Sequence, residues 1–229
     1  MKSVGRIIKG TLGLLSLIVL TGGFLGAYPP LAVASSPADP VLEWDAIMND
    51  TVLAGATSPF ATSRVAAMVS ASVFDAVNGI RPRYKPLRVR PAAPRYASQR
   101  AAAVQAAYAI LIKQYPAQIA SLTTRHDASI AAIASSEGAR SIQAGITWGQ
   151  SVADSIWAWR LTDGITPPPP PFLGVLGIVG SPSAVGVWRP TPLVNAPGAA
   201  VQFATMTPWV LQRPSQFRLP PPLPLTSTE

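Results

Sequence analysis

The chain contains a single histidine and no cysteine, which limits the chemistry that its side chains can perform. His126 stands between Arg125 and Asp127 in a polar stretch, where it could act as a general base. Acid–base catalysis needs a second group that converges on the same reacting atoms, and the sequence offers none. We therefore expect His126 to be a solvated surface residue. The lack of cysteine excludes disulfides and thiolate metal sites.

Seven basic residues occur close together in a stretch that four prolines interrupt. They could hold phosphate, an anionic lipid or nucleic acid, and Tyr84 and Tyr96 supply rings on which bases could stack. The prolines favour an extended, solvated loop over such a dedicated site, so we expect no nucleic-acid partner. The basic residues are Arg81, Arg83, Lys85, Arg88, Arg90, Arg95 and Arg100, and the prolines are Pro82, Pro86, Pro91 and Pro94.

Two further pairs of residues have chemical potential but a simpler structural interpretation. Asp75 and Asn78 could bind a metal ion together, but we expect a polar contact for Asp75 and a helix-end role for Asn78. Trp157 and Trp159 flank one helix end and are expected to be packing residues. The sequence has no Gly-rich phosphate loop, nucleophile elbow or zinc-ligand spacing. It therefore predicts no catalytic, cofactor-binding or metal-binding residue.

Hydrophobic residues at steps of three and four predict an all-α fold, an antiparallel helical bundle over residues 35–164. Asp39 and Pro40 suit the start of the first helix, and Ser98 suits the start of the third. We expect the second helix to begin near Thr62 and Ser63 and to end at Asn78-Gly79, in the left-handed conformation that closes many helices. The other helices are expected over residues 99–115, about 117–135 and about 137–161.

Prolines dominate the sequence after Gly164, beginning with the run Pro167–Pro171. Such runs cannot continue a helix and favour extended backbone. Five large aromatic residues in the same stretch are typical of buried positions, so we expect residues 165–229 to form an irregular Pro-rich arm that packs against protein surface. Thr226 to Glu229 have the spacing of a capping box, which predicts a helix beyond them. The five aromatic residues are Phe172, Trp188, Phe203, Trp209 and Phe217.

The first 34 residues have the pattern of a signal peptide: a basic start, an apolar run over residues 11–27, and Ala32-Val33-Ala34 before the expected new N-terminus at Ser35. The alternative is an uncleaved membrane anchor, although the run is shorter than the about 20 apolar residues of a typical span. Cleavage would place the protein in the periplasm or outside the cell. It would also lower the net charge from +8 to +5, because residues 1–34 hold three basic and no acidic residues.

Three groups of residues stand in a distinctive order along the chain. The first is Val-Leu-Glu-Trp-Asp-Ala-Ile at 41–47. The second is Arg-Val-Ala-Ala-Met-Val at 64–69, leading to Phe-Asp-Ala-Val-Asn-Gly-Ile at 74–80. The third is Val-Trp-Arg-Pro-Thr-Pro at 187–192, Met-Thr-Pro-Trp at 206–209, Pro-Ser-Gln-Phe-Arg at 214–218, and the prolines at 220–222 before Leu-Thr-Ser at 225–227. Together they resemble the N-terminal half of bacterial vanadium-dependent haloperoxidase-like proteins, of the type 2 phosphatidic acid phosphatase superfamily.

The resemblance implies that the chemistry of the family lies in the other half of the protein. There, Lys, Arg, Ser-Gly-His and a further Arg and His bind vanadate or phosphate, for peroxide-dependent halide oxidation or phosphate ester hydrolysis. That chemistry needs two imidazoles, one for the central atom and one for a proton. This chain has no Ser-Gly-His, and Lys85 with Arg90-Pro91 has the wrong spacing. No catalytic residue can be carried over, and no cofactor is expected in this chain.

We therefore expect an exported N-terminal scaffold that is inactive alone, whose partner is a missing C-terminal catalytic half or a separate chain that carries it. Two alternatives stay open. One is an exported, non-catalytic helical binding or scaffold module. The other is a membrane-surface protein held by an uncleaved N-terminus and the basic stretch 81–100. Homo-oligomer formation is compatible with each of them.

Overall fold

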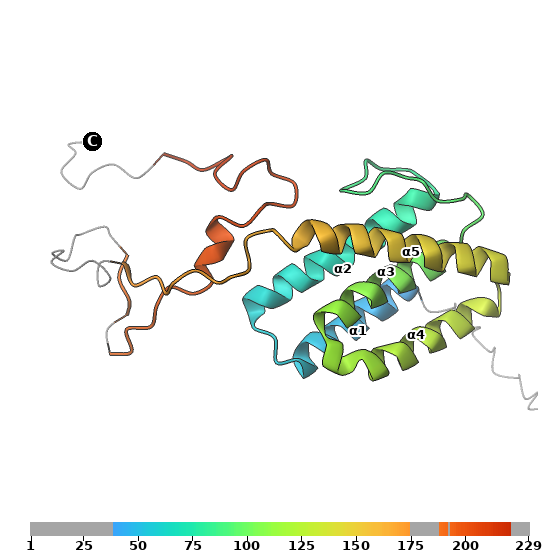
Figure 1. Ribbon diagram of the computed structural model, residues 1–229, viewed down its shortest axis with the longest axis horizontal. Coiled ribbons are helices and arrows are strands. Elements are labelled where there is room, and N and C mark those ends of the chain that lie inside the picture. Colours follow the sequence, from blue (N-terminus) through green and yellow to red (C-terminus); the bar gives the residue numbers. More distant parts are fainter. Residues whose placement is uncertain (1–38, 175–187, 192, 221–229) are drawn as a thin grey trace, which may run out of the picture. The chain divides into compact units, whose positions relative to one another are not determined.

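The computed structural model of this chain describes residues 39–174, 188–191 and 193–220. Within these ranges the chain forms five α-helices, two 3₁₀ helices and no strand, which confirms the predicted all-α class. Figure 1 shows the α-helices side by side, with α4 and α5 running in opposite directions. The predicted signal peptide and the capping box at 226–229 lie outside the described residues.

The helices follow the chain in a simple order. The α-helices are α1 (Pro40–Ala54), α2 (Pro59–Ile80), α3 (Gln99–Gln114), α4 (Ile119–Ala134) and α5 (Ala139–Arg160). The 3₁₀ helix η1 (Pro116–Gln118) connects α3 to α4, and η3 (Val201–Ala204) lies in the arm. The arm also contains one antiparallel β-bridge, between Phe172 and Gly198.

Side-chain caps fix where the helices begin. The Asp39 carboxylate accepts a hydrogen bond of 2.9 Å from the Val41 N–H, and the Ser98 hydroxyl accepts one of 2.9 Å from Ala101, as predicted. The expected start of α2 at Thr62 and Ser63 was wrong. The helix begins at Pro59, because Ser58 supplies the capping hydroxyl and Pro59 occupies the first helical position, where its missing N–H costs nothing.

The predicted end of α2 was also wrong. Asn78 and Gly79 stay helical, and the helix ends one residue later, at Ile80. Gly79 is placed there by packing, since a Cβ atom at this position would lie 2.4 Å from Cζ2 of Trp148. The Trp148 indole in turn donates a hydrogen bond of 2.9 Å to the Ala76 carbonyl, which fixes α5 on α2. Gly164, with φ of +94°, adopts the left-handed conformation after α5.

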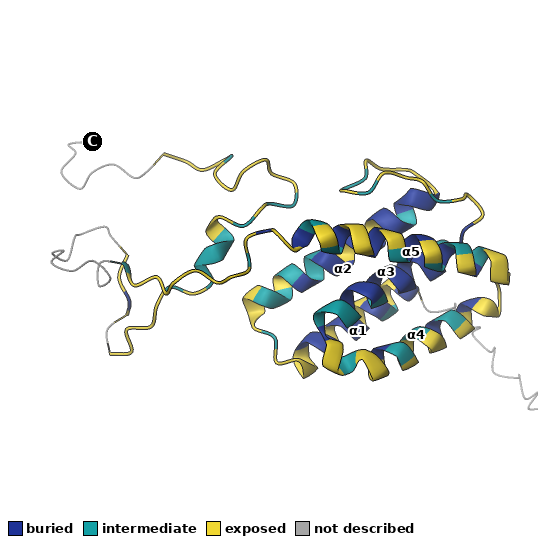
Figure 2. Ribbon diagram, in the orientation of Figure 1, coloured by how far each residue is buried: buried dark blue, intermediate teal, exposed yellow. Residues whose placement is uncertain are grey.

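Helix α3 forms the centre of the bundle and contacts each of the other α-helices. Its many alanines are buried, as the dark blue ribbon in Figure 2 shows. Two glycines of α5 allow a very close approach: a Cβ at Gly145 would lie 2.4 Å from the Ser98 carbonyl oxygen, and one at Gly149 would lie 2.5 Å from that of Ala102. The α3–α5 interface is therefore packed backbone against backbone.

Among the described helices, α2 is the one that is long and apolar enough to cross a membrane. The core helix of a soluble protein passes the same test of length and composition. Here Val65, Met68, Val69 and Ala76 of α2 belong to the hydrophobic core, where they pack with residues of α1, α3 and α5. These contacts account for the apolar residues on the buried side of the helix.

Candidate functional site

His126 is not the solvated surface residue that its polar neighbours in the sequence suggested. Its side chain is 14% exposed. Nε2 lies 2.8 Å from the Gln105 side-chain oxygen, Nδ1 lies 3.0 Å from the Asp127 carboxylate, and the ring packs against Tyr108 with centroids 4.5 Å apart. The expectation failed because the burying partners come from α3. Both ring nitrogens are already engaged, so the imidazole links α4 to α3.

Asp75 makes the polar contact expected of it and is completely buried. Its two carboxylate oxygens accept hydrogen bonds of 2.8 Å from the backbone N–H groups of Leu87, Arg88 and Val89. Three backbone donors are thus satisfied by one side chain of α2. The middle of the basic stretch is anchored to the bundle rather than free in solvent.

Asn78 anchors the beginning of the same loop. Its side-chain oxygen accepts hydrogen bonds from the N–H groups of Arg83 (2.9 Å) and Tyr84 (3.0 Å), and its amide donates one to the Tyr84 carbonyl (2.9 Å). Asp75 and Asn78 therefore hold two segments of one loop instead of forming a metal pair. In the described part of the chain, no group of three or more His, Cys, Asp or Glu residues could hold a metal ion.

The loop presents most of the predicted basic residues to solvent. Arg81, Arg83, Lys85, Arg88, Arg90 and Arg95 are exposed. The Arg88 guanidinium lies 5.2 Å from the Trp159 ring centroid. Arg100 is separate from this group, because it lies on α3, donates to the Ser136 hydroxyl at 3.2 Å and pairs with Glu137 at 3.8 Å. The group of exposed basic residues therefore extends from Arg81 to Arg95 and, unlike the stretch that the sequence had suggested, does not include Arg100.

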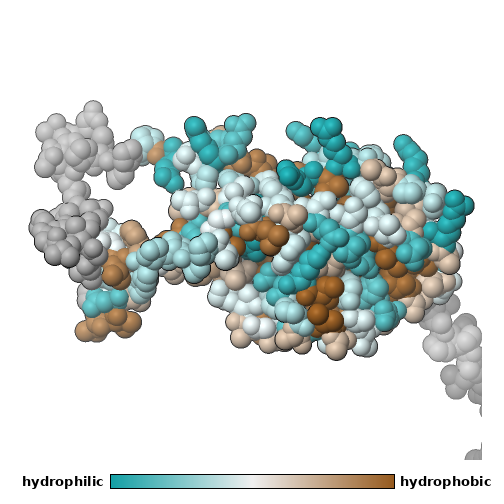
Figure 3. All heavy atoms as spheres, viewed as in Figure 1, coloured by the Kyte–Doolittle hydropathy of each residue, from teal (hydrophilic) through white to brown (hydrophobic). Residues whose placement is uncertain are grey.

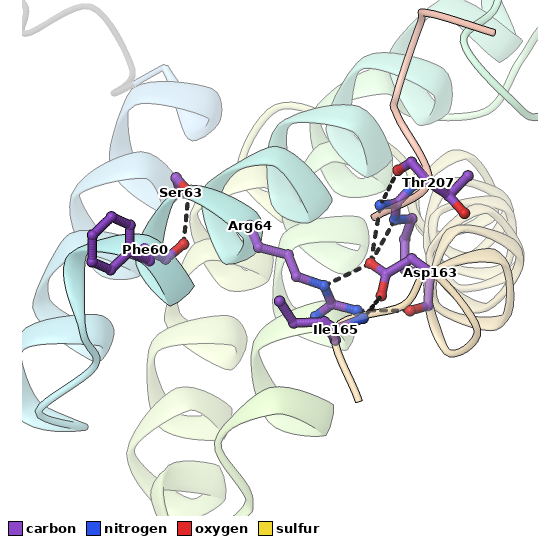
Figure 4. Close-up of polar contacts among 7 residues, drawn as sticks. Phe60, Ser63, Arg64, Asp163, Ile165 and Thr207 are labelled. Carbon is purple, nitrogen blue, oxygen red and sulfur yellow. Dashed lines mark hydrogen bonds and ion pairs between the residues drawn. The ribbon is translucent and has the colours of Figure 1, made fainter. Parts of the chain in front are cut away.

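A buried ion cluster joins the end of α5 to α2 and to the arm. Asp163 accepts a hydrogen bond of 2.7 Å from Nε of Arg64 and one of 3.1 Å from Nε of Arg160. Arg160 also donates 2.8 Å to the Thr207 carbonyl, and the Thr207 N–H donates 2.7 Å to the Asp163 carbonyl. Figure 4 shows Arg64 and Thr207 converging on Asp163 from different segments. We call Arg64, Arg160 and Asp163 the arm anchor.

Two tryptophans enclose the Arg160 guanidinium. It lies 4.8 Å from the Trp159 ring centroid and 4.2 Å from that of Trp209, and the two indoles meet edge to face at 5.2 Å. Burial lowers the pKa of Arg160 from its ordinary value, while Asp163 acts in the opposite direction. Among the buried side-chain polar atoms of the described residues, Nη1 of Arg160 alone has no hydrogen-bond partner. Trp159 packs against Arg160 and Trp209, which confirms the prediction that it is a packing residue.

The aromatic residues of the arm divide into two groups. Trp209 packs on the core, and the ring of Phe203 lies beside that of Phe60 of α2, with centroids 6.5 Å apart. Phe172 and Trp188 contact each other but are each almost half exposed, and Phe217 is 76% exposed. The expected burial of the arm is therefore correct for Trp209 and wrong for Phe217 within the described residues. Among the described residues of the arm, the exposed aliphatic side chains are Leu173, Leu193, Val194, Val210, Leu211 and Leu219.

The exposed hydrophobic side chains of the arm can be followed on the molecular surface. Figure 3 shows brown atoms on the arm, and further brown areas among the teal and white atoms of the helices. A monomeric soluble protein rarely exposes a large contiguous apolar patch without a function. These side chains are attached to a segment whose start is fixed by the arm anchor.

A hollow of about 530 Å³ lies between α1, α2 and the loop that begins at Arg81, which we call the basic loop (residues 81–98). Trp44, Val69, Val73 and Phe74 are among the apolar residues that line it. Arg81, Arg83, Asp45 and Tyr84 are among its polar residues. Sequence reasoning missed this hollow, because the residues come from segments that only the fold brings together.

The arm anchor was also missed from the sequence. Arg160 and Asp163 stand three residues apart at the end of a predicted helix, which is a detectable signal for a local ion pair. Arg64 is 99 residues from Asp163 and gave no such signal.

No protein-family model, curated protein or solved structure matches this chain.

Proposed function

We propose that this chain is the exported helical scaffold of a haloperoxidase-like or acid-phosphatase-like assembly, and that another polypeptide segment supplies the catalytic groups. The observation that carries the proposal is the state of the arm: buried charges fix its beginning on the bundle, while several of its hydrophobic side chains, Phe217 and Leu219 among them, remain exposed. A fixed apolar segment loses little conformational freedom when it binds a protein surface. This favours the arm as the contact to a catalytic partner.

The engagement of His126 supports the same proposal. Vanadate ligation or phosphoryl transfer in this superfamily needs two imidazoles, and the sequence contains one. That one is held between Gln105, Asp127 and Tyr108. A reaction that needs a free imidazole would have to break these contacts, so we assign His126 a structural role.

The test combines the nucleotide sequence with two assays. The DNA beyond the codon of Glu229 is read in all frames for a Ser-Gly-His segment, and the encoded polypeptide is produced together with this chain. We expect bromination of a phenolic dye with peroxide and vanadate, or cleavage of p-nitrophenyl phosphate, from the complex and not from this chain alone. Either activity in the isolated chain would overturn the proposal, and the lack of a Ser-Gly-His segment in every frame would count strongly against it.

Variants of the arm connect the assay to the structure. Phe217→Ser with Leu219→Ser should abolish co-purification of the partner, because these side chains are 76% and 83% exposed. The matched control is Leu42→Ser with Leu53→Ser on α1, which are 71% and 78% exposed. Equal retention of the partner by both double variants would contradict the proposed role of the arm.

One observation favours a second candidate function, an exported binding module without catalysis. The hollow of about 530 Å³ has the size of ordinary small-molecule pockets, which span about 300–1,000 Å³. For this function the chain should unfold in one cooperative thermal transition without any partner. Aggregation of the isolated chain at low temperature would count against it.

A further inference from the structure

The hollow between α1, α2 and the basic loop combines an apolar interior with charged groups from the loop. Its wall contains core residues, with Trp44 1%, Val69 4% and Val73 9% exposed. Phe74 and Tyr84, whose rings lie 6.3 Å apart, are also among its lining residues. An apolar chain in this space would exchange water for aliphatic and aromatic contacts, at about 25 cal/mol per Å² of buried apolar surface.

The charged groups at the hollow have an unequal balance. Arg81 and Arg83 contribute two positive charges and Asp45 contributes one negative charge. Across the described residues, neither guanidinium forms an ion pair, and Asp45 forms none either. The net excess of positive charge favours an anionic group. A guanidinium can donate two parallel hydrogen bonds to a carboxylate or phosphate, so both head groups fit the same chemistry.

The loop that carries these arginines is held in place by buried polar groups. Asn78, which is 5% exposed, makes three hydrogen bonds to the backbone of Arg83 and Tyr84. Asp75 holds the next part of the loop through three more. A ligand would therefore meet a backbone that is already ordered, and the entropic cost of binding would be correspondingly small.

From this combination we infer that the hollow binds an anionic amphiphile with one apolar chain. The head group binds at Arg81 and Arg83, and the chain packs against Val69, Val73 and Phe74. The inference names a ligand class for the binding-module function. It rests on α1, α2 and the loop and does not involve the arm, so its failure leaves the proposed scaffold role untouched.

The experiment is calorimetric titration of the purified full chain with decanoate, decyl phosphate and decanol, each below its micelle-forming concentration. We expect one saturable site for both anions. Arg81→Gln with Arg83→Gln should weaken anion binding at least about tenfold, the equivalent of about 1.4 kcal/mol, and leave decanol binding unchanged. If only one anion binds, that result selects carboxylate or phosphate as the head group and supports the site.

The matched control is Arg90→Gln with Arg95→Gln, which removes the same charge from the same loop outside the lining of the hollow. This control should bind within about twofold of the unmodified protein, since only unspecific attraction is reduced. Equal weakening by both double variants would overturn the inference. So would the lack of saturable binding of either anion by the unmodified chain.

A blocking variant tests the location of the apolar chain. Ser70 is exposed and lines the hollow, so Ser70→Trp should fill the space without disturbing the core, and binding should be lost while the thermal midpoint is kept. A second readout does not depend on that variant. Trp44 lines the hollow, so 10-bromodecanoate should quench tryptophan fluorescence with the same saturation as the calorimetric signal. Binding without quenching would contradict the location.

Discussion

Arg160 and Asp163 form an ion pair in which neither side chain has any exposed surface, with Nη2 of the arginine 2.9 Å from Oδ2 of the aspartate. A buried pair of this kind adds little net stability, because both charges lose their hydration. Removing one partner is far more costly, since the other charge remains buried without compensation. The pair therefore acts mainly to specify how the arm begins.

The first prediction concerns this pair. Asp163→Ala should lower the free energy of unfolding by about 3–5 kcal/mol, because Arg64 and Arg160 lose their shared counter-charge. Urea denaturation followed by circular dichroism measures the loss. Asp50→Ala removes an exposed carboxylate that pairs with Arg125 and should cost less than about 1 kcal/mol. A similar small cost for Asp163→Ala would show that the cluster is solvated.

The second prediction concerns the anchored loop. Asp75→Ala removes the acceptor of three backbone N–H groups and should cost at least about 2 kcal/mol. Because the released loop is rich in arginine, trypsin should cut it faster than in the unmodified protein. Limited proteolysis with mass spectrometry locates the cuts, and Asp50→Ala serves again as the control. Unchanged cleavage after Arg88, which valine follows, would refute the anchoring role of Asp75.

The third prediction concerns the α2–α5 contact. Gly79→Ala would place a methyl group 2.4 Å from the Trp148 ring, so the indole must move and its bond to the Ala76 carbonyl must stretch. Overpacking of this kind costs about 1–3 kcal/mol. Thermal unfolding measures the cost. Gly138→Ala is the control for the added methyl group, since no atom beyond its chain neighbours lies within 4 Å of the added Cβ; the loss of Gly at the N-cap of α5 should cost no more than about 1 kcal/mol. Equal midpoints for the two variants would be inconsistent with this packing.

The fourth prediction concerns the pH dependence of stability. Partial burial would raise the pKa of Asp154, but hydrogen bonds from Lys113 and Gln150 and the charge of Lys113 outweigh it and lower that pKa below its ordinary value of 3.8. A lowered pKa stabilises the fold above the unfolded value, and this stability is lost as the pH falls through the folded value.

Asp154→Asn should therefore cost less than about 1 kcal/mol at pH 7, because the aspartate is 52% exposed and the ion pair with Lys113 is screened. The difference between the variant and the unmodified protein should vanish as the pH falls below 3.8. Urea denaturation at a series of pH values checks this. A difference that stays constant down to the lowest pH would assign the effect to packing instead of charge.

Local signals in the sequence predicted the helices well where the cap is a side chain next to the helix. Asp39 and Ser98 cap α1 and α3 as expected. Ser58 caps α2 with an equally local signal, but the Thr62-Ser63 pair suggested a later start. Val41 stands three residues before the buried Trp44 and six before the buried Ile47, a helical spacing, yet it is 44% exposed. Spacing identifies a face but not what covers it.

The functional features depended on contacts between distant residues and could not be predicted in the same way. His126 has charged neighbours in the sequence, yet its environment is set by Gln105 and Tyr108, 21 and 18 positions earlier. Asp75 was correctly assigned a polar contact, but its partners lie in a loop whose path the prolines alone do not determine. The hollow and the arm anchor follow from the packing of α1, α2, α5 and the arm.

The backbone-to-backbone interface of α3 and α5 has a consequence for how this protein can vary. At Gly145 and Gly149 the obstacle to a larger residue is a main-chain carbonyl oxygen, of Ser98 and of Ala102. When a side chain blocks a substitution, a smaller residue at the neighbouring position can relieve the clash. A carbonyl group belongs to every residue, so no second-site suppressor can be found there. Evolution of this bundle must keep both glycines or separate the two helices altogether.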